Sequence, residues 1–149
     1  MTGNEIRKVV EIDASPDVVF KALTDPKELT HWLPDAAMLE PKVGGKFKFS
    51  FYKDSTRSCG KRDGDSVSEG KILELVPGKK LVYTWKWANA PEFPQTVVTW
   101  DLEKIGQNKT RLTLTHTGFT GAEESSKSAK DHDEGWSMHL NELITRYKK

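Results

Sequence analysis

Cysteine and net charge are both scarce in this sequence. Cys59 is the single cysteine among 149 residues, which excludes an intrachain disulfide and is typical of a protein in a reducing compartment. The 23 basic residues nearly balance the 22 acidic residues, so the formal net charge is +1. This balance provides no bulk electrostatic field to recruit nucleic acid or an anionic membrane. We therefore expect a cytoplasmic protein with no nucleic-acid partner.

Long hydrophobic runs are also missing. No stretch approaches the roughly 18 apolar residues that a membrane span requires, and the N-terminus lacks the basic-then-apolar pattern of a secretion signal. Hydrophobic residues make up 36% of the chain and charged residues 30%, as in globular proteins rather than disordered or membrane proteins. We expect a single domain over residues 1–149, without a membrane partner.

The familiar motifs of catalysis and cofactor binding are absent as well. The sequence contains no Gly-rich phosphate loop, no nucleophile elbow and no paired-cysteine metal motif. The run Asp131-His132-Asp133-Glu134 resembles a metal cluster, but consecutive residues of a helix point about 100° apart and cannot all converge on one ion. We therefore predict no cofactor, no metal site and no catalytic residue.

The last stretch of the chain shows the clearest periodicity. Trp136, Leu140, Leu143 and Tyr147 recur at steps of four, three and four residues, which places them on one face of a helix. The segment 120–123 has the spacing of a capping box, with threonine at the cap and glutamate three residues later. The pattern predicts one long helix, roughly 122–148, with an apolar stripe in its second half.

The opening of the chain predicts a strand followed by two short helices. Residues 6–13 carry apolar side chains at even spacing, as in a strand. Ser15-Pro16 and Asp25-Pro26 each combine a capping side chain with proline at the first helical position. The second helix should end before Pro34, because the residue preceding a proline disfavours the helical conformation.

Between these helices and the C-terminal helix, apolar and polar residues alternate in a series of short segments. Turn signals separate the segments, so the connections are short and the strands should form an antiparallel meander. The fold class is therefore α+β, with a curved antiparallel sheet wrapped around the long C-terminal helix. Five or six strands are predicted here, with alternation at residues 46–52, 72–76, 81–87, 98–103 and 111–117.

Several segments spread over the chain form an ordered set of motifs. They are residues 19–26 with Trp32, 44–47, 69–77, 81–85, 110–119, and 135–136 with Leu140 and Leu143. This ordered set resembles domains related to the activator of Hsp90 ATPase (the AHSA1-like family), which belongs to the START-like, or SRPBCC, helix-grip superfamily with its Bet v 1-like folds. The resemblance implies a concave sheet gripping the C-terminal helix, with an apolar cavity between them.

The resemblance implies several functions rather than one. Members of the superfamily bind lipids, sterols or polyketides, some cyclise polyketides, and the namesake activates a chaperone. The eukaryotic form of that namesake carries a separate N-terminal domain, which this sequence does not show. We therefore rank a small apolar or aromatic molecule first as the partner, and a chaperone below it.

Two interpretations stay open for the inward aromatic residues, because they could form plain core or the walls of a ligand cavity. Five tryptophans in 149 residues favour a cavity, since large rigid rings can span a hollow and stack on flat ligands. Trp32 could close the mouth of such a cavity or fasten its helix to the sheet. The predicted ligand-binding residues are Phe49, Phe51, Tyr83, Trp85, Trp100, His116, Trp136 and His139.

Three function classes follow from this interpretation. The first is binding of a small hydrophobic or aromatic ligand between the C-terminal helix and the sheet, with His116, His139 and Tyr83 as orienting polar groups. The second is a co-chaperone-like interaction module, and the third a polyketide cyclase or dehydratase that uses the histidines as acid and base. A filled core would favour the interaction module, whereas a hollow lined by histidines would favour the other two.

Overall fold

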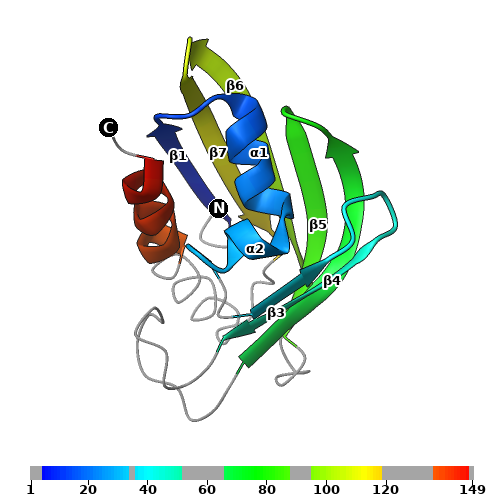
Figure 1. The fold of residues 1–149 in the computed structure, drawn as a ribbon. Helices are drawn as coiled ribbons and strands as arrows, with labels where there is room; N and C mark the ends of the chain where they lie inside the picture. Colours follow the sequence, from blue (N-terminus) through cyan, green and yellow to red (C-terminus); the bar gives the residue numbers. More distant parts are fainter. Residues whose placement is uncertain (1–4, 34–35, 52–65, 88–94, 119–135, 148–149) are drawn as a thin grey trace.

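The structure, a computed structural model, describes residues 5–33, 36–51, 66–87, 95–118 and 136–147 (Figure 1). Of Phe51, Ser66 and Trp87 it describes the backbone alone. Several sequence predictions lie outside these residues: the loop around Cys59, the turn region at 88–94, the capping box at 120–123 and the acidic run at 131–134.

The strands form a seven-stranded sheet in which every neighbouring pair is antiparallel. The order is β1-β7-β6-β5-β4-β3-β2, so the predicted meander is confirmed, and the first strand joins it beside the last. Gly44 and Gly78 turn the chain with φ of +83° and +74°, a region that favours glycine. The strands are β1 (Ile6–Ile12), β2 (Ala36–Leu39), β3 (Lys46–Phe51), β4 (Ser66–Val76), β5 (Lys80–Trp87), β6 (Thr96–Gly106) and β7 (Lys109–Thr117).

Two strand boundaries differ from the sequence prediction. The strand β2 was not predicted, because its Ala-Ala-Met-Leu sequence has neither alternation nor β-branched residues. The strand β4 begins at Ser66 rather than at residue 72, because its first residues are small or polar and carry no apolar alternation. In both places the pairing with β3 supplies the strand conformation that the local sequence does not indicate.

The two predicted short helices are present as α1 (Pro16–Thr24) and α2 (Pro26–Leu29). Ser15 Oγ accepts a hydrogen bond from the backbone of Val18, and Asp25 Oδ1 accepts one from Lys27, so both predicted caps are confirmed. The predicted end of the second helix is wrong. The helix stops at Leu29, whose carbonyl accepts hydrogen bonds from the backbone N–H of both Trp32 and Leu33, and these bonds close tight turns instead.

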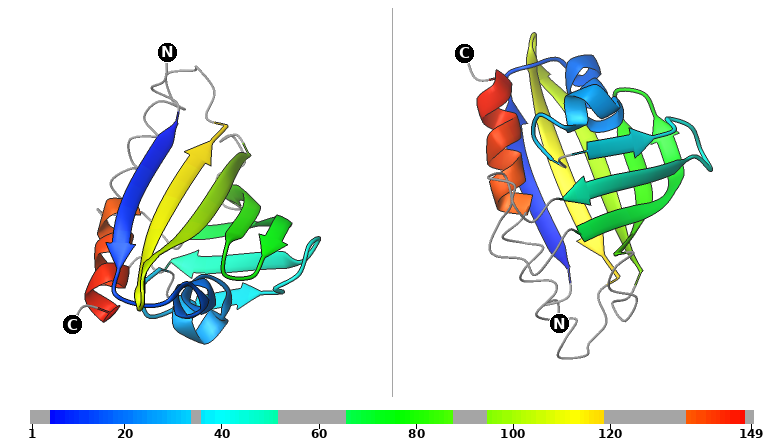
Figure 2. Two further views of the ribbon diagram at one scale, coloured as in Figure 1. Left: turned by 90° about the horizontal axis from the view of Figure 1, so that it is seen from above. Right: turned by 60° about the horizontal axis from the view of Figure 1, so that its bottom comes forward.

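The C-terminal helix is described over residues 136–147 and runs alongside β1 (Figures 1 and 2). Trp136, Leu140 and Leu143 are buried, as the helical stripe predicts. Trp136 contacts rings of β5 and β6, so this helix packs against the inner face of the curved sheet. No helix in the described ranges has both the length and the hydropathy that a membrane crossing requires.

Candidate functional site

Aromatic rings of β3 and β5 lean toward each other above the intervening strand β4. The strands β3 and β5 are separated by two inter-strand spacings, or about 10 Å. The ring centroids of Phe47 and Tyr83 are nevertheless 4.7 Å apart, and those of Phe49 and Trp85 are 6.2 Å apart. This approach is sterically feasible because β4 places Gly70 opposite Phe47 and Ser68 opposite Phe49. The small residues of β4 therefore form a floor beneath the aromatic rings.

A second group of rings connects the sheet to the C-terminal helix. The Trp136 centroid lies 5.4 Å from that of Trp85 and 5.4 Å from that of Trp100. Trp100 in turn meets Trp32 edge-on at 6.0 Å. Such aromatic pairs add about 0.5–1.5 kcal/mol each beyond their burial. Trp32, Trp100 and Trp136 are therefore packed together in the buried core, and Trp32 fastens its segment to the sheet.

Tyr83 and Trp100 form a buried polar pair on this inner face. The indole N–H of Trp100 donates to the phenolic oxygen of Tyr83 at 2.9 Å. Burial raises the pKa of Tyr83 well above its ordinary value of 10.0, and the hydrogen bond from Trp100 lowers it by less. Tyr83 is therefore a neutral phenol over the physiological range.

His116 has both ring nitrogens engaged by protein groups. The indole N–H of Trp136 donates to Nδ1 at 3.0 Å, so Nδ1 carries no proton. Thr96 Oγ1 lies 2.6 Å from Nε2 and donates its own hydrogen to the Trp85 carbonyl, so it must accept from Nε2–H. His116 is thus a neutral imidazole tying β6 and β7 to the helix. Acid–base chemistry at His116 would require breaking one of these bonds.

His139 is held by another part of the chain. Its Nδ1 donates to the carbonyl of Trp32 at 3.1 Å, and the Trp32 indole N–H donates to the carbonyl of Ala22 at 2.9 Å. His116 and His139 therefore bind different partners, and the acid–base pairing considered for them receives no support from these contacts. Within the described ranges, no group of three His, Cys, Asp or Glu residues could hold a metal ion.

Ser68 is a buried polar residue that the sequence analysis missed. Its side chain is 0% exposed, and its Oγ has no hydrogen-bond partner among the described residues. The hydroxyl lies on the inner face, because Ser68 shares the side of β4 that carries the buried Ile72. The small residues that precede the apolar part of β4 are visible in the sequence. They lie outside the predicted strand, which begins at residue 72, so the sequence did not indicate which face of the sheet Ser68 occupies.

Phe51 is the last residue of β3, and its side chain lies outside the described part of the chain. The remaining predicted residues on the sheet (Phe49, Tyr83, Trp85, Trp100 and His116) are buried on the inner face, together with Trp136 and His139 from the helix. The structure therefore brings these side chains into one core, and their role in ligand binding stays a prediction.

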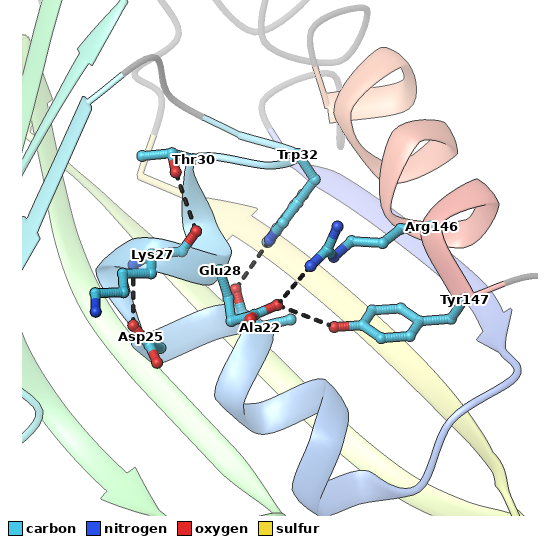
Figure 3. A network of polar contacts seen from close by, with 8 residues as sticks. All are labelled: Ala22, Asp25, Lys27, Glu28, Thr30, Trp32, Arg146 and Tyr147. Carbon is cyan, nitrogen blue, oxygen red and sulfur yellow. Dashed lines mark hydrogen bonds and ion pairs between the residues drawn. The ribbon is translucent and has the colours of Figure 1, made fainter.

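The end of the C-terminal helix is fastened to α2 by a carboxylate (Figure 3). Glu28 Oε1 accepts hydrogen bonds from Arg146 Nη2 at 3.1 Å and from the Tyr147 hydroxyl at 3.4 Å. The bond from the Trp32 indole to the Ala22 carbonyl lies in the same region (Figure 3). These contacts connect the end of the C-terminal helix to α2.

Comparisons with solved structures show the same fold over nearly the whole chain. Protein CV1439 from Chromobacterium violaceum is 24% identical, with a TM-score of 0.80 and 98% of each chain covered. Protein MLL2253 from Mesorhizobium loti is 26% identical, with a TM-score of 0.73, covering 94% of this chain and 95% of that one. The helix-grip fold predicted from the sequence is therefore confirmed.

An HSP90 activator from Plasmodium falciparum is 25% identical to this chain, with a TM-score of 0.69 and 97% of each chain covered. A comparison with curated proteins gives no match. Residues 13–147 match the sequence model of the family described as Activator of Hsp90 ATPase homolog 1-like protein. The match spans most of the chain and agrees with the resemblance found in the sequence. This chain therefore belongs to the Activator of Hsp90 ATPase homolog 1-like family.

Proposed function

We propose that this protein binds a small hydrophobic or aromatic ligand between the C-terminal helix and the inner face of the sheet. The observation that carries the proposal is the buried hydroxyl of Ser68, which has no hydrogen-bond partner among the described residues although aromatic rings surround its strand. Buried polar groups in native proteins nearly always have a partner, and an exception calls for an explanation. A ligand that bonds to the hydroxyl when bound would supply one.

The ligand would lie over the β3–β5 part of the sheet rather than beside Trp32 and Trp100. Phe49 and Trp85 flank the small floor of β4, and their rings meet at 64° in an edge-on contact rather than a full stack. A flat ligand that enters here would separate the two rings and form aromatic contacts with each of them, which would replace the contact that the rings lose. The energetic cost of admitting it is therefore smaller than the cost of opening an aliphatic core.

A thermal-shift and fluorescence screen tests the proposal. The compounds should include fatty acids, sterols, flavonoids and aromatic polyketides. A ligand at 100 times its dissociation constant stabilises the folded state by about 2.7 kcal/mol. For a domain of this size we expect a rise in melting temperature of roughly 5–10 °C, at roughly 2–4 °C per kcal/mol. Tryptophan emission should change as well, because Trp85 lies at the proposed site. Failure of every class in both readouts would exclude the proposal.

A second candidate is a direct interaction with an Hsp90-type chaperone. The specific observation in its favour is the likeness to the Plasmodium falciparum HSP90 activator, which extends over 97% of that activator's chain. We rank it second, because a chaperone contact would not explain the buried hydroxyl of Ser68.

An ATPase assay separates the two candidates. The purified protein is added at micromolar concentration to an Hsp90-type chaperone, with albumin as the protein control. We expect no change in the rate of ATP hydrolysis. Clear stimulation by this protein alone would place the chaperone interaction first.

A further inference from the structure

The row of residues around Ser68 combines a polar floor with aromatic walls. In the register of the sheet, Ser68 stands opposite Phe49 of β3 on one side and Trp87 of β5 on the other. Two residues further along β4, Gly70 stands opposite Phe47, and a side chain at this position would meet the backbone of Thr84 in β5. The floor is therefore small and carries one described hydroxyl, which is itself fully buried.

A serine at this position has a free-energy cost that an alanine would not have. The hydroxyl has been removed from water, and no described residue accepts or donates a hydrogen bond to it. Leaving a buried polar group unsatisfied destabilises the folded state, whereas an apolar group of similar size would not. The unsatisfied hydroxyl departs from the rule that buried polar groups are hydrogen-bonded. Departures of this kind occur at functional sites, where a bound ligand can provide the hydrogen-bond partner.

Tyr83 and His116, two other buried polar residues beside the rings, are already bonded within the protein. Tyr83 accepts from Trp100, and His116 is bonded to Trp136 and Thr96. Ser68 therefore offers the one described hydroxyl on this face that is bonded to no other described residue. A hydroxyl has one hydrogen to donate and two lone pairs to accept, so it can bind either a phenol or a carbonyl oxygen.

We infer that the Ser68 hydroxyl is the hydrogen-bonding group of the ligand site, and that the ligand is a flat aromatic molecule carrying an oxygen at its edge, such as a phenol or an aromatic ketone. This inference rests on the proposed function. The faces of the ligand would contact Phe49 and Trp85, and its edge oxygen would meet Ser68. The aromatic rings provide affinity for flat molecules in general, and Ser68 selects those that carry the oxygen.

The test compares 2-naphthol with naphthalene, which lacks the oxygen. Dissociation constants are measured by equilibrium dialysis for the wild type, Ser68→Ala and the matched control Ser50→Ala. Ser50 is half-buried on the opposite face of the neighbouring strand β3. The quantity compared is the ratio of the naphthalene constant to the 2-naphthol constant, so general effects on apolar binding cancel.

We expect this ratio to decrease by a factor of about two to about ten in Ser68→Ala, relative to the wild type. This is the range that one neutral hydrogen bond contributes. Naphthalene binding should stay unchanged, and Ser50→Ala should behave as the wild type. An unchanged ratio in Ser68→Ala, with both probes still bound, would overturn the role of Ser68 and leave the proposed function standing. Failure of the wild type to bind either probe up to its solubility limit would overturn the inference of a flat aromatic ligand, whereas the proposed function is decided by the broader screen of compound classes.

A second variant tests whether the change in binding in Ser68→Ala results from altered packing rather than from the lost hydrogen bond. Ser68→Cys replaces the hydroxyl by a somewhat larger thiol, which is a weaker hydrogen-bonding group. It should bind naphthalene as the wild type does and give a ratio between those of the wild type and Ser68→Ala. A ratio equal to that of the wild type in both variants would exclude a hydrogen bond from this position.

Discussion

Trp136 donates its indole N–H to Nδ1 of His116 at 3.0 Å, and this one bond decides which nitrogen of the histidine carries the proton. His116 then donates from Nε2 to Thr96 Oγ1. The histidine therefore connects the C-terminal helix to β6 through β7. His116 is thus a structural link between the helix and the sheet, and its predicted role in ligand binding stays a prediction.

The first prediction concerns this link. The variant His116→Leu leaves the buried Trp136 N–H without its acceptor and Thr96 Oγ1 without the donor from His116. We therefore expect a loss of about 1–3 kcal/mol in the free energy of unfolding, besides any change in packing. Chemical denaturation of this variant, of Trp136→Phe and of the double variant forms a thermodynamic cycle. A coupling energy of at least about 0.5 kcal/mol is expected. Strictly additive losses would show that the bond contributes nothing.

The second prediction concerns Tyr83 at alkaline pH. An unfolded tyrosine ionises near pH 10, whereas burial keeps Tyr83 neutral in the folded state because its pKa is raised. The unfolded chain then binds fewer protons than the folded chain, so this contribution is complete below pH 10 and stability falls as the pH rises above 10.

A spectroscopic titration checks this behaviour. Phenolate absorbance from Tyr83 should appear only together with loss of tertiary circular dichroism, and Tyr83→Phe should lack that coupled step. Ionisation of Tyr83 at its ordinary pKa in the intact fold would contradict its burial beneath the rings.

The third prediction is that Ser68→Ala increases the stability of the folded protein. Ser68→Ala removes a buried hydroxyl that has no described partner, so in the absence of ligand we expect the protein to become more stable by about 1 kcal/mol. The melting temperature should rise by roughly 2–4 °C, while Ser50→Ala should leave it nearly unchanged. A fall in the melting temperature of Ser68→Ala would mean that its hydroxyl is already satisfied.

The fourth prediction concerns the gripped helix. Leu140 is 2% exposed on the buried face of the C-terminal helix. Leu140→Asp would bury an unpaired charge at a cost of several kcal/mol, against a typical total stability of about 5–15 kcal/mol. We expect loss of cooperative thermal unfolding in circular dichroism. The adjacent exposed position provides the control, since Asn141→Asp should unfold as the wild type does. Equal stability of the two variants would show that Leu140 does not contribute to the core.

Local sequence determined the elements whose signals lie within a few residues of one another. Ser15-Pro16 and Asp25-Pro26 predict helix starts, because capping and the fixed φ of proline act over a single turn. The alternation in β5 and the stripe of the C-terminal helix predict their buried faces, because burial follows the period of each element. The ordered motifs also identified the family correctly. The single domain and the cytoplasmic location stay predictions.

Only the tertiary structure decided the features that depend on contacts between distant residues. The strand β2 and the beginning of β4 adopt their conformation by pairing with β3, which no local pattern indicates. The tautomer of His116 depends on Trp136, 20 residues away in sequence. The burial of the Ser68 hydroxyl also depends on residues distant in sequence, because rings of β3 and β5 meet over β4 and cover it. Periodicity indicates which face of a strand is buried, but only packing decides whether a buried polar atom finds a partner.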